Sequence, residues 1–208
     1  MCRPIAAVFV DRIQHTRVTP NQITLLSALV AGVAVVLLGA WPGYVGLLVA
    51  IAIYEGSYVL DCADGMLARL RGIQSARGHL LDFLMDELKA FAMLSAAAFR
   101  LFRDSGDERW LLAGLFGLCA LASGTALTTF QRRPEVVLPA GPTAPKSLLG
   151  RALGLVEAAG KFVVHYPSYV WLAAVFGRLE LYVLPYVVAN ALYAARAFAA
   201  VARRFARE

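Results

Sequence analysis

Four aspartates, Asp61, Asp64, Asp82 and Asp86, stand between two long apolar runs of the sequence. The first two are three residues apart and the last two are four apart, so each pair shares one face if its segment is helical. A charge at mid-membrane depth costs about 2.5 to 3.5 kcal/mol even on mild insertion scales. Such a cluster therefore indicates a function, and two acidic faces turned toward each other would form a site of four carboxylates.

The donor set of this site would consist of carboxylate oxygens without histidine or cysteine. Such a set favours hard divalent cations, Mg²⁺ or Mn²⁺, over zinc or copper. These ions suit phosphate chemistry because they neutralise phosphate oxygens. Gly65 and Gly78 give each acidic face a position without a side chain, where a ligand can approach the backbone.

The residues around the aspartates match D-x2-D-G-x2-A-R-x8-G-x3-D-x3-D at every fixed position, from Asp61 to Asp86. This pattern resembles the signature of the CDP-alcohol phosphotransferases. The resemblance implies an integral membrane enzyme with six transmembrane helices, usually a homodimer, with a site for two metal ions that opens toward the cytosol. It also implies transfer of a substituted phosphate from a CDP-linked alcohol, often CDP-diacylglycerol, to an acceptor hydroxyl, with release of CMP, in phospholipid head-group biosynthesis.

The resemblance also implies roles for the aspartates. Asp61, Asp64 and Asp82 are expected to hold the metal ions, Mg²⁺ or Mn²⁺, and Asp86 to be shared between the second ion and the acceptor. Asp86 is our candidate for the general base, since a carboxylate near the acceptor hydroxyl can take its proton.

Other residues are candidates for contact with the two substrates. The nucleotide candidates are Gly65, Ala68, Arg69, Gly78, Asn21 and Thr24. Arg69 offers a planar donor fork for a phosphate or an aspartate, whereas Asn21 and Thr24 could equally serve only the start of a helix. The acceptor candidates, for an inositol phosphate or a glycerol phosphate, are Arg132, Arg133, Lys146, Arg151 and Lys161, which could also be ordinary cytosolic basic residues. Glu55 is expected to pair with Lys89 or Lys161, or to point to the acceptor pocket.

The composition indicates one membrane domain over residues 1–208. The chain is 60% hydrophobic, and its mean hydropathy of +0.64 is too high for a soluble domain. Backbone polar groups in lipid must be satisfied within the chain, so we predict an all-α polytopic protein. A surface helix over residues 1–19, with basic and apolar residues interleaved, is expected to precede a six-helix transmembrane bundle over residues 20–203.

The predicted elements follow the apolar runs and the turn residues between them. Thr19 is expected to cap the first span and Pro20 to open it. Five of the six spans are predicted over 23–40, 44–69, 78–99, 110–130 and 179–201. The fifth along the chain is predicted to begin near 155 or 161 and to end at 176. A mixed-charge loop is predicted at 100–109 and a proline-rich connection over 131–150.

The basic residues predict the orientation. Arg100, Arg103, Arg109 and Arg178 lie on the side away from the termini, whereas most other basic residues lie on the side of the termini. Both termini and the aspartates are therefore expected to face the cytosol. The net charge of +6 then reflects topology and anionic lipid, not nucleic-acid binding.

Three alternatives remain open at the level of the sequence. The donor could be a soluble CDP-alcohol, with a lipid or polyol as the acceptor. A metal-dependent prenyltransferase also uses acidic pairs on membrane helices, although with other spacings. A divalent-cation carrier would not need Gly65, Ala68, Arg69 and Gly78 at these intervals.

Overall fold

The computed structural model describes residues 2–133, 136 and 169–206, and within these ranges the regular elements are all helices. Four of the helices are long and apolar enough to cross a membrane, namely α2, α3, α5 and α8. The chain is therefore an all-α integral membrane protein. The helices are α1 (Cys2–Ile13), α2 (Pro20–Ala40), α3 (Gly43–Leu70), α4 (Ala76–Ser105), α5 (Arg109–Gln131), α7 (Val170–Val175) and α8 (Glu180–Phe205).

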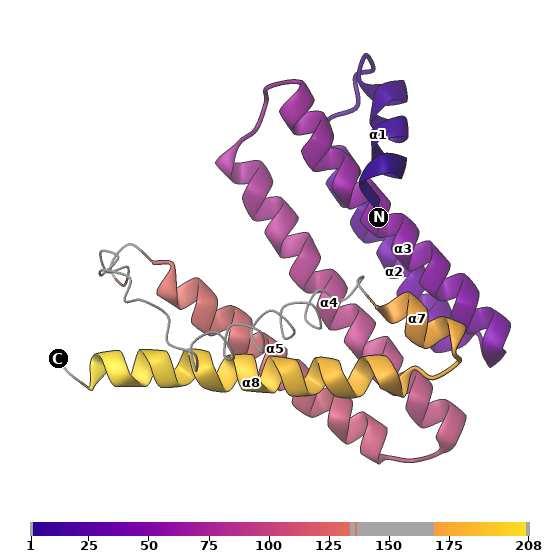
Figure 1. Cartoon of the computed structure of the whole chain (residues 1–208), viewed down its shortest axis with the longest axis vertical. Coiled ribbons are helices and arrows are strands. Elements are labelled where there is room, and N and C mark those ends of the chain that lie inside the picture. Colours follow the sequence, from indigo (N-terminus) through magenta and orange to yellow (C-terminus); the bar gives the residue numbers. More distant parts are fainter. Residues whose placement is uncertain (1, 134–135, 137–168, 207–208) are drawn as a thin grey trace, which may run out of the picture.

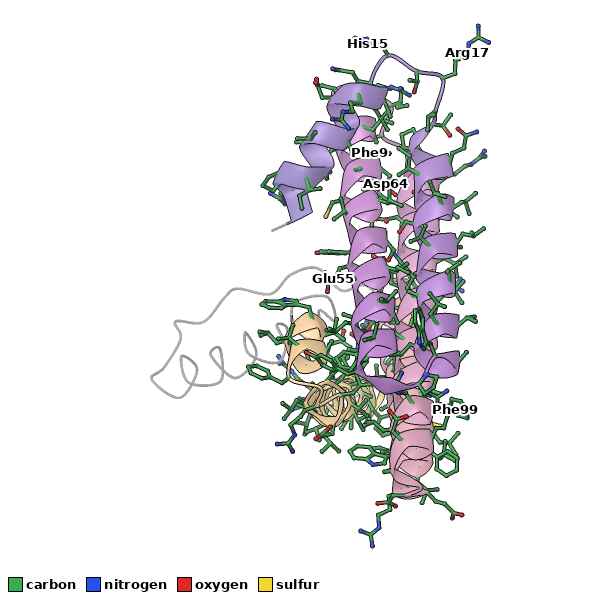
Figure 2. All side chains as sticks on the ribbon, turned by 90° about the vertical axis from the view of Figure 1, so that its right-hand side faces the viewer. Phe9, His15, Arg17, Glu55, Asp64 and Phe99 are labelled. Atoms are coloured by element: carbon green, nitrogen blue, oxygen red, sulfur yellow. The ribbon has the colours of Figure 1, made fainter. Side chains whose placement is uncertain are left out.

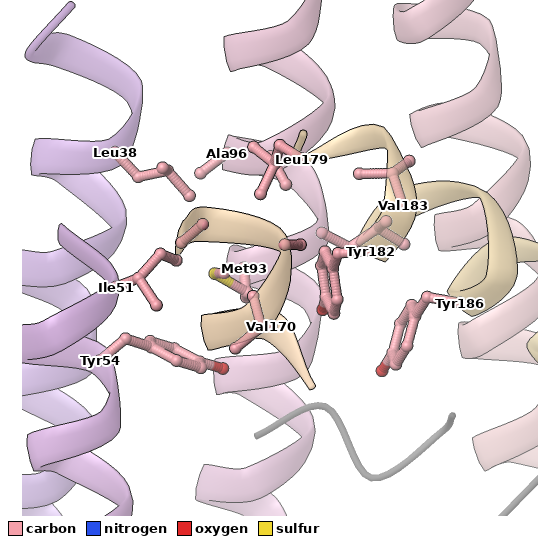
Figure 3. Packing of buried hydrophobic residues seen from close by; sticks show 14 of the residues in the cluster. Leu38, Ile51, Tyr54, Met93, Ala96, Val170, Leu179, Tyr182, Val183 and Tyr186 are labelled. Carbon is pink, nitrogen blue, oxygen red and sulfur yellow. The ribbon is translucent and has the colours of Figure 1, made fainter. Parts of the chain in front are cut away.

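Helices α2, α3 and α4 form one bundle, and α5 and α8 run side by side across its lower end in the view of Figure 1. The short helix α7 packs on α3 and leads into α8. Where these elements meet, Tyr54, Met93, Val170, Tyr182 and Tyr186 are buried in one core (Figure 3). Because this core joins the bundle to α7 and α8, it fixes the helices that carry the aspartates.

The start of α2 confirms the predicted cap. Thr19 and Gln22 form a capping box, and Pro20 is the first helical residue. The helix ends at Ala40 with Trp41 as its C-cap, and Gly43 has a φ of 81°, which allows the sharp turn into α3.

Helix α1 packs on the part of α3 that carries the first aspartate pair. Its Ala6 and Val10 are buried against residues of α2 and α3, while Ile5 and Val8 on the other side are exposed. The helix ends at Ile13, earlier than the predicted residue 19. Its end is held by Arg71, whose guanidinium donates to the carbonyls of Ile13, Gln14, Thr16 and Val18.

Helix α4 continues six residues past the predicted end at Phe99, so the predicted loop at 100–109 is wrong over most of its length. Arg100 is buried and donates to the carbonyls of Leu38, Trp41 and Gly43 at the junction of α2 and α3. This arginine therefore caps a neighbouring helix instead of marking an exposed loop. The helix ends at Ser105, and its C-cap is Gly106, whose φ is 71°.

The predicted fifth span and the connection before it lie largely outside the described residues. Of that span the structure describes α7 and the turn that follows it, where Gly177 has a φ of 63°. Helix α8 begins at Glu180, close to the predicted residue 179, and continues to Phe205.

Candidate active site

The acidic pairs of α3 and α4 meet near one end of the bundle. Asp61 and Asp64 come from the last third of α3, and Asp82 comes from the second turn of α4. Each of the three offers a carboxylate oxygen, and these oxygens all lie within 4.8 Å of one another. Figure 2 shows Asp64 toward the end where His15 and Arg17 lie, and Phe99 toward the opposite end. We call Asp61, Asp64 and Asp82 the acidic cluster.

Helix α2 supplies two hydroxyls to the acidic cluster. The Thr24 hydroxyl donates to Asp64 Oδ2, and both residues are buried. Ser27, one turn further along α2, is also buried, and its Oγ lies 3.5 Å from Asp61 Oδ1. Thr24 was a candidate for nucleotide contact, whereas Ser27 was missed by the sequence reasoning. Its spacing of three residues from Thr24 was the available signal.

Asp86 stands beside the acidic cluster and is linked to it through Lys89. The Lys89 Nζ lies 2.5 Å from Asp61 Oδ1 and 2.8 Å from Asp86 Oδ1. The expected pairing of Glu55 with Lys89 is therefore wrong, because the lysine is held by two aspartates. Glu55 Oε1 is buried and has no hydrogen-bond partner in the part of the chain that the structure describes.

The nucleotide candidates lie around the two acidic faces. A Cβ atom on Gly65 would lie 3.3 Å from Nη1 of Arg69, so the arginine of the signature extends over the glycine. A Cβ atom on Gly78 would lie 3.5 Å from Oδ1 of Asn21, so the starts of α2 and α4 are close together. Ala68 is half-buried on α3, one turn after Asp64.

Of the acceptor candidates, Arg132 lies beside α4. Its guanidinium carbon is 6.0 Å from the ring centroid of Phe83, the residue that follows Asp82. Arg133 is exposed, two residues beyond the end of α5. Lys146, Arg151 and Lys161 lie outside the described residues.

Comparisons with solved structures agree with this architecture. Phosphatidylinositol phosphate synthase of Mycobacterium tuberculosis with CDP-DAG bound superposes with a TM-score of 0.58 at 19% identity, over 95% of this chain and 92% of that one. The same synthase in complex with manganese and citrate gives 0.58 at 18% identity, over 95% and 89% of the two chains. At these identities the likeness shows a shared fold.

Comparisons of sequence give the family. The bifunctional IPC transferase and DIPP synthase of Aquifex aeolicus is 32% identical over 107 residues, which are 51% of this chain and 24% of that protein. The chain thus matches about a quarter of the length of that relative. The family model for CDP-alcohol phosphatidyltransferase matches residues 17–179, which include the acidic cluster and Asp86. The chain therefore belongs to the CDP-alcohol phosphatidyltransferase family.

Proposed function

We propose that the chain transfers a phosphatidyl group from CDP-diacylglycerol to the hydroxyl of an acceptor and releases CMP. The observation that carries this proposal is the acidic cluster, which two helices form within the residues that the family model matches. The donor is supported by the mycobacterial synthase of the same fold, whose structure contains CDP-DAG. A soluble CDP-alcohol is the alternative donor.

The acidic cluster fits a divalent cation. Its three oxygens lie within 4.8 Å of one another, close enough to converge on one ion, and the site contains carboxylates without sulfur or nitrogen ligands. This donor set matches Mg²⁺ or Mn²⁺, and manganese is present in a structure of the mycobacterial synthase. Divalent ions bound there would neutralise the charge of the phosphate oxygens. In our proposal Asp61, Asp64 and Asp82 hold them, with Asp86 at the edge of the site.

The chain's own residues then position the substrates and move one proton. Asp86 is half-buried and reachable from solvent, so it can take the proton of the acceptor hydroxyl. The acceptor oxygen forms a bond to the β-phosphorus, the bond from that phosphorus to the bridging oxygen breaks, and its electron pair leaves with CMP. Arg69 donates to a phosphate of the donor, and Gly65 and Gly78 leave room for the cytidine and its pyrophosphate.

An inositol phosphate or a glycerol phosphate is the acceptor class that we propose. The support is Arg132, which lies next to the segment of Asp82 and Asp86 through its contact with Phe83. A guanidinium there can bind a phosphate group with two parallel hydrogen bonds. Arg133, Lys146, Arg151 and Lys161 remain further candidates for the same role.

We further propose six spans, a homodimer, and a site that faces the cytosol together with both termini. Helix α4 has 30 residues, enough to cross a bilayer, although it carries the charged residues of the site. The fifth span of this proposal is the one that the sequence predicts to end at residue 176, and most of it lies outside the described residues. The cytosolic orientation is supported by the basic residues on the side of the termini.

The test is CMP release by the purified protein in nanodiscs with Mg²⁺ or Mn²⁺, CDP-diacylglycerol, and a panel of acceptors: inositol, inositol phosphate, glycerol phosphate, serine, ethanolamine and choline. Asp86→Asn should abolish turnover while metal binding by the acidic cluster persists, because the amide cannot accept the proton. Asp61→Asn should weaken metal and nucleotide binding together. Near-normal turnover in Asp86→Asn would refute the assignment of the base. If the panel yields no CMP, the same assay with a soluble CDP-alcohol as donor follows, and release there would favour the alternative donor.

A further inference from the structure

Lys89 is a buried cation at the point where α2, α3 and α4 meet. Its side chain is 3% exposed. Its ammonium group has three N–H bonds, and the structure provides three acceptors for them: Asp61 Oδ1 at 2.5 Å, Asp86 Oδ1 at 2.8 Å and Ser27 Oγ at 3.3 Å. The family signature ends at Asp86, so it assigns no role to this lysine.

The position of Lys89 is fixed through both its side chain and its backbone. Ser27 of α2 accepts from Lys89 and donates its own proton to the carbonyl of Ser57 on α3, at 2.9 Å. The Lys89 carbonyl accepts from the hydroxyl of Tyr54 on α3, at 3.3 Å. The charge of Lys89 therefore has a defined place between three helices, whereas the charge of a surface lysine would move freely in water.

The four aspartates place negative charges close together. Oxygens of the acidic cluster lie within 4.8 Å of one another, and Asp86 is joined to Asp61 through Lys89. Carboxylates at such distances repel one another, and the repulsion grows where water is largely excluded. Of the basic side chains that the structure describes, Lys89 is the one that forms ion pairs with these aspartates. It therefore compensates part of their charge from within the protein.

We propose that Lys89 is a positioning residue, a built-in counter-ion that keeps the four aspartates assembled before divalent ions enter. Its ammonium group contacts Oδ1 of Asp61 and Oδ1 of Asp86, and it leaves the second oxygen of each carboxylate for a metal ion. Asp86 thus remains available to the second ion and to the acceptor. This role rests on the proposed metal site and not on the identity of the donor or the acceptor.

Removal of this charge should make the stability of the protein depend on the metal. Lys89→Met has a side chain of similar length, so it fills the same space without the cation. Loss of one partner of a buried ion pair is strongly destabilising, because the other charge stays buried without compensation. Divalent ions bound by the same carboxylates would replace the missing charge and stabilise the folded state.

The experiment is thermal unfolding of the purified protein in detergent, without substrate, once in EDTA and once in saturating Mn²⁺. In EDTA, Lys89→Met should unfold at least about 5 °C below the wild type. In Mn²⁺ the difference between the two proteins should shrink to less than half. Arg109→Met removes a cation whose side chain is 90% exposed and should leave both unfolding temperatures unchanged.

A double variant separates charge from packing. Asp61→Asn removes one of the carboxylates that Lys89 compensates, so in EDTA Lys89→Met should cost clearly less in the Asp61→Asn background than in the wild type. A lysine that only fills space would cost the same in both backgrounds. If Lys89→Met cannot be purified, Lys89→Gln keeps a donor for Asp61 and should show the same pattern with a smaller loss.

Two results would overturn the role of Lys89. One is an unfolding temperature of Lys89→Met in EDTA within about 2 °C of the wild type. The other is a loss of equal size in EDTA and in Mn²⁺ although Mn²⁺ stabilises the wild type. If Mn²⁺ stabilises neither the wild type nor any variant, the proposed metal site is wrong, while the single and double variants in EDTA still decide the role of Lys89. Absence of CMP release despite stabilisation by Mn²⁺ would refute the proposed reaction alone.

Discussion

The Thr24 hydroxyl should contribute measurably to metal binding, although Thr24 lies on α2 and the aspartates of the acidic cluster lie on α3 and α4. It donates to Asp64 Oδ2 and so orients that carboxylate within the acidic cluster. Thr24→Val keeps the shape of the side chain and removes the donor. A hydrogen bond to a charged acceptor contributes about 1.5 to 3 kcal/mol. We expect the lower end, because the Pro20 carbonyl, 3.2 Å from Thr24 Oγ1, competes for the single proton.

A loss of about 1.5 kcal/mol corresponds to a roughly tenfold higher Kd for the metal ion. Titration calorimetry with Mn²⁺ on the protein in nanodiscs measures this directly. Thr24→Ser is the matched control, since it retains the hydroxyl and should bind as the wild type does. If Thr24→Val binds Mn²⁺ within about twofold of the wild type, the contact with Asp64 does not orient the carboxylate for the ion.

Two further predictions concern packing. Arg71→Gln should speed amide exchange over residues 14–18, the connection between α1 and α2, because the guanidinium donates to carbonyls in this connection. Arg77→Gln, at an exposed arginine, is the control. Equal exchange rates in the two variants would show that Arg71 does not hold the connection in place. Gly114→Ala should cost about 1 to 3 kcal/mol and lower the unfolding temperature in detergent, since its Cβ would lie 2.5 Å from that of Ala98. Gly32→Ala meets nothing within 4 Å and should be neutral or slightly stabilising; an equal loss in both would rule out the packing explanation.

The sequence predicted the helices well where an apolar run ends at a strong turn signal. The turn at Trp41 and Gly43 and the cap at Thr19 are examples. Proline fixes φ at the start of a helix, and glycine permits the positive φ that the turn requires. The length of α4 was not predictable in the same way. Its last turns carry Arg100, which looks like a loop residue until the carbonyls at the end of α2 supply its partners. Such partners come from another helix, so only the fold reveals them.

The acidic cluster was predictable because its residues follow a local rule. Spacings of three and four residues place side chains on one face of a helix, and a short turn brings two such faces together. Thr24, Ser27 and Lys89 act across helix interfaces, so their contacts depend on the rotation and the axial shift of whole helices. Thr24 could be singled out through its place near the start of α2, whereas the only sequence signal for Ser27 was its spacing of three residues from Thr24.

Some basic residues of this chain bind other groups of the protein, and only the remaining ones indicate how the chain is oriented in the membrane. Arg71 and Arg100 bind backbone carbonyls at helix ends, and Lys89 binds carboxylates, so all three serve the fold or the site. Arg103 joins them, since it donates to the Gly39 carbonyl. When these residues are set aside, the side away from the termini keeps only Arg109 and Arg178 of its predicted basic residues. The side of the termini loses Arg71 alone from a much larger set, so the remaining asymmetry still favours a site that faces the cytosol.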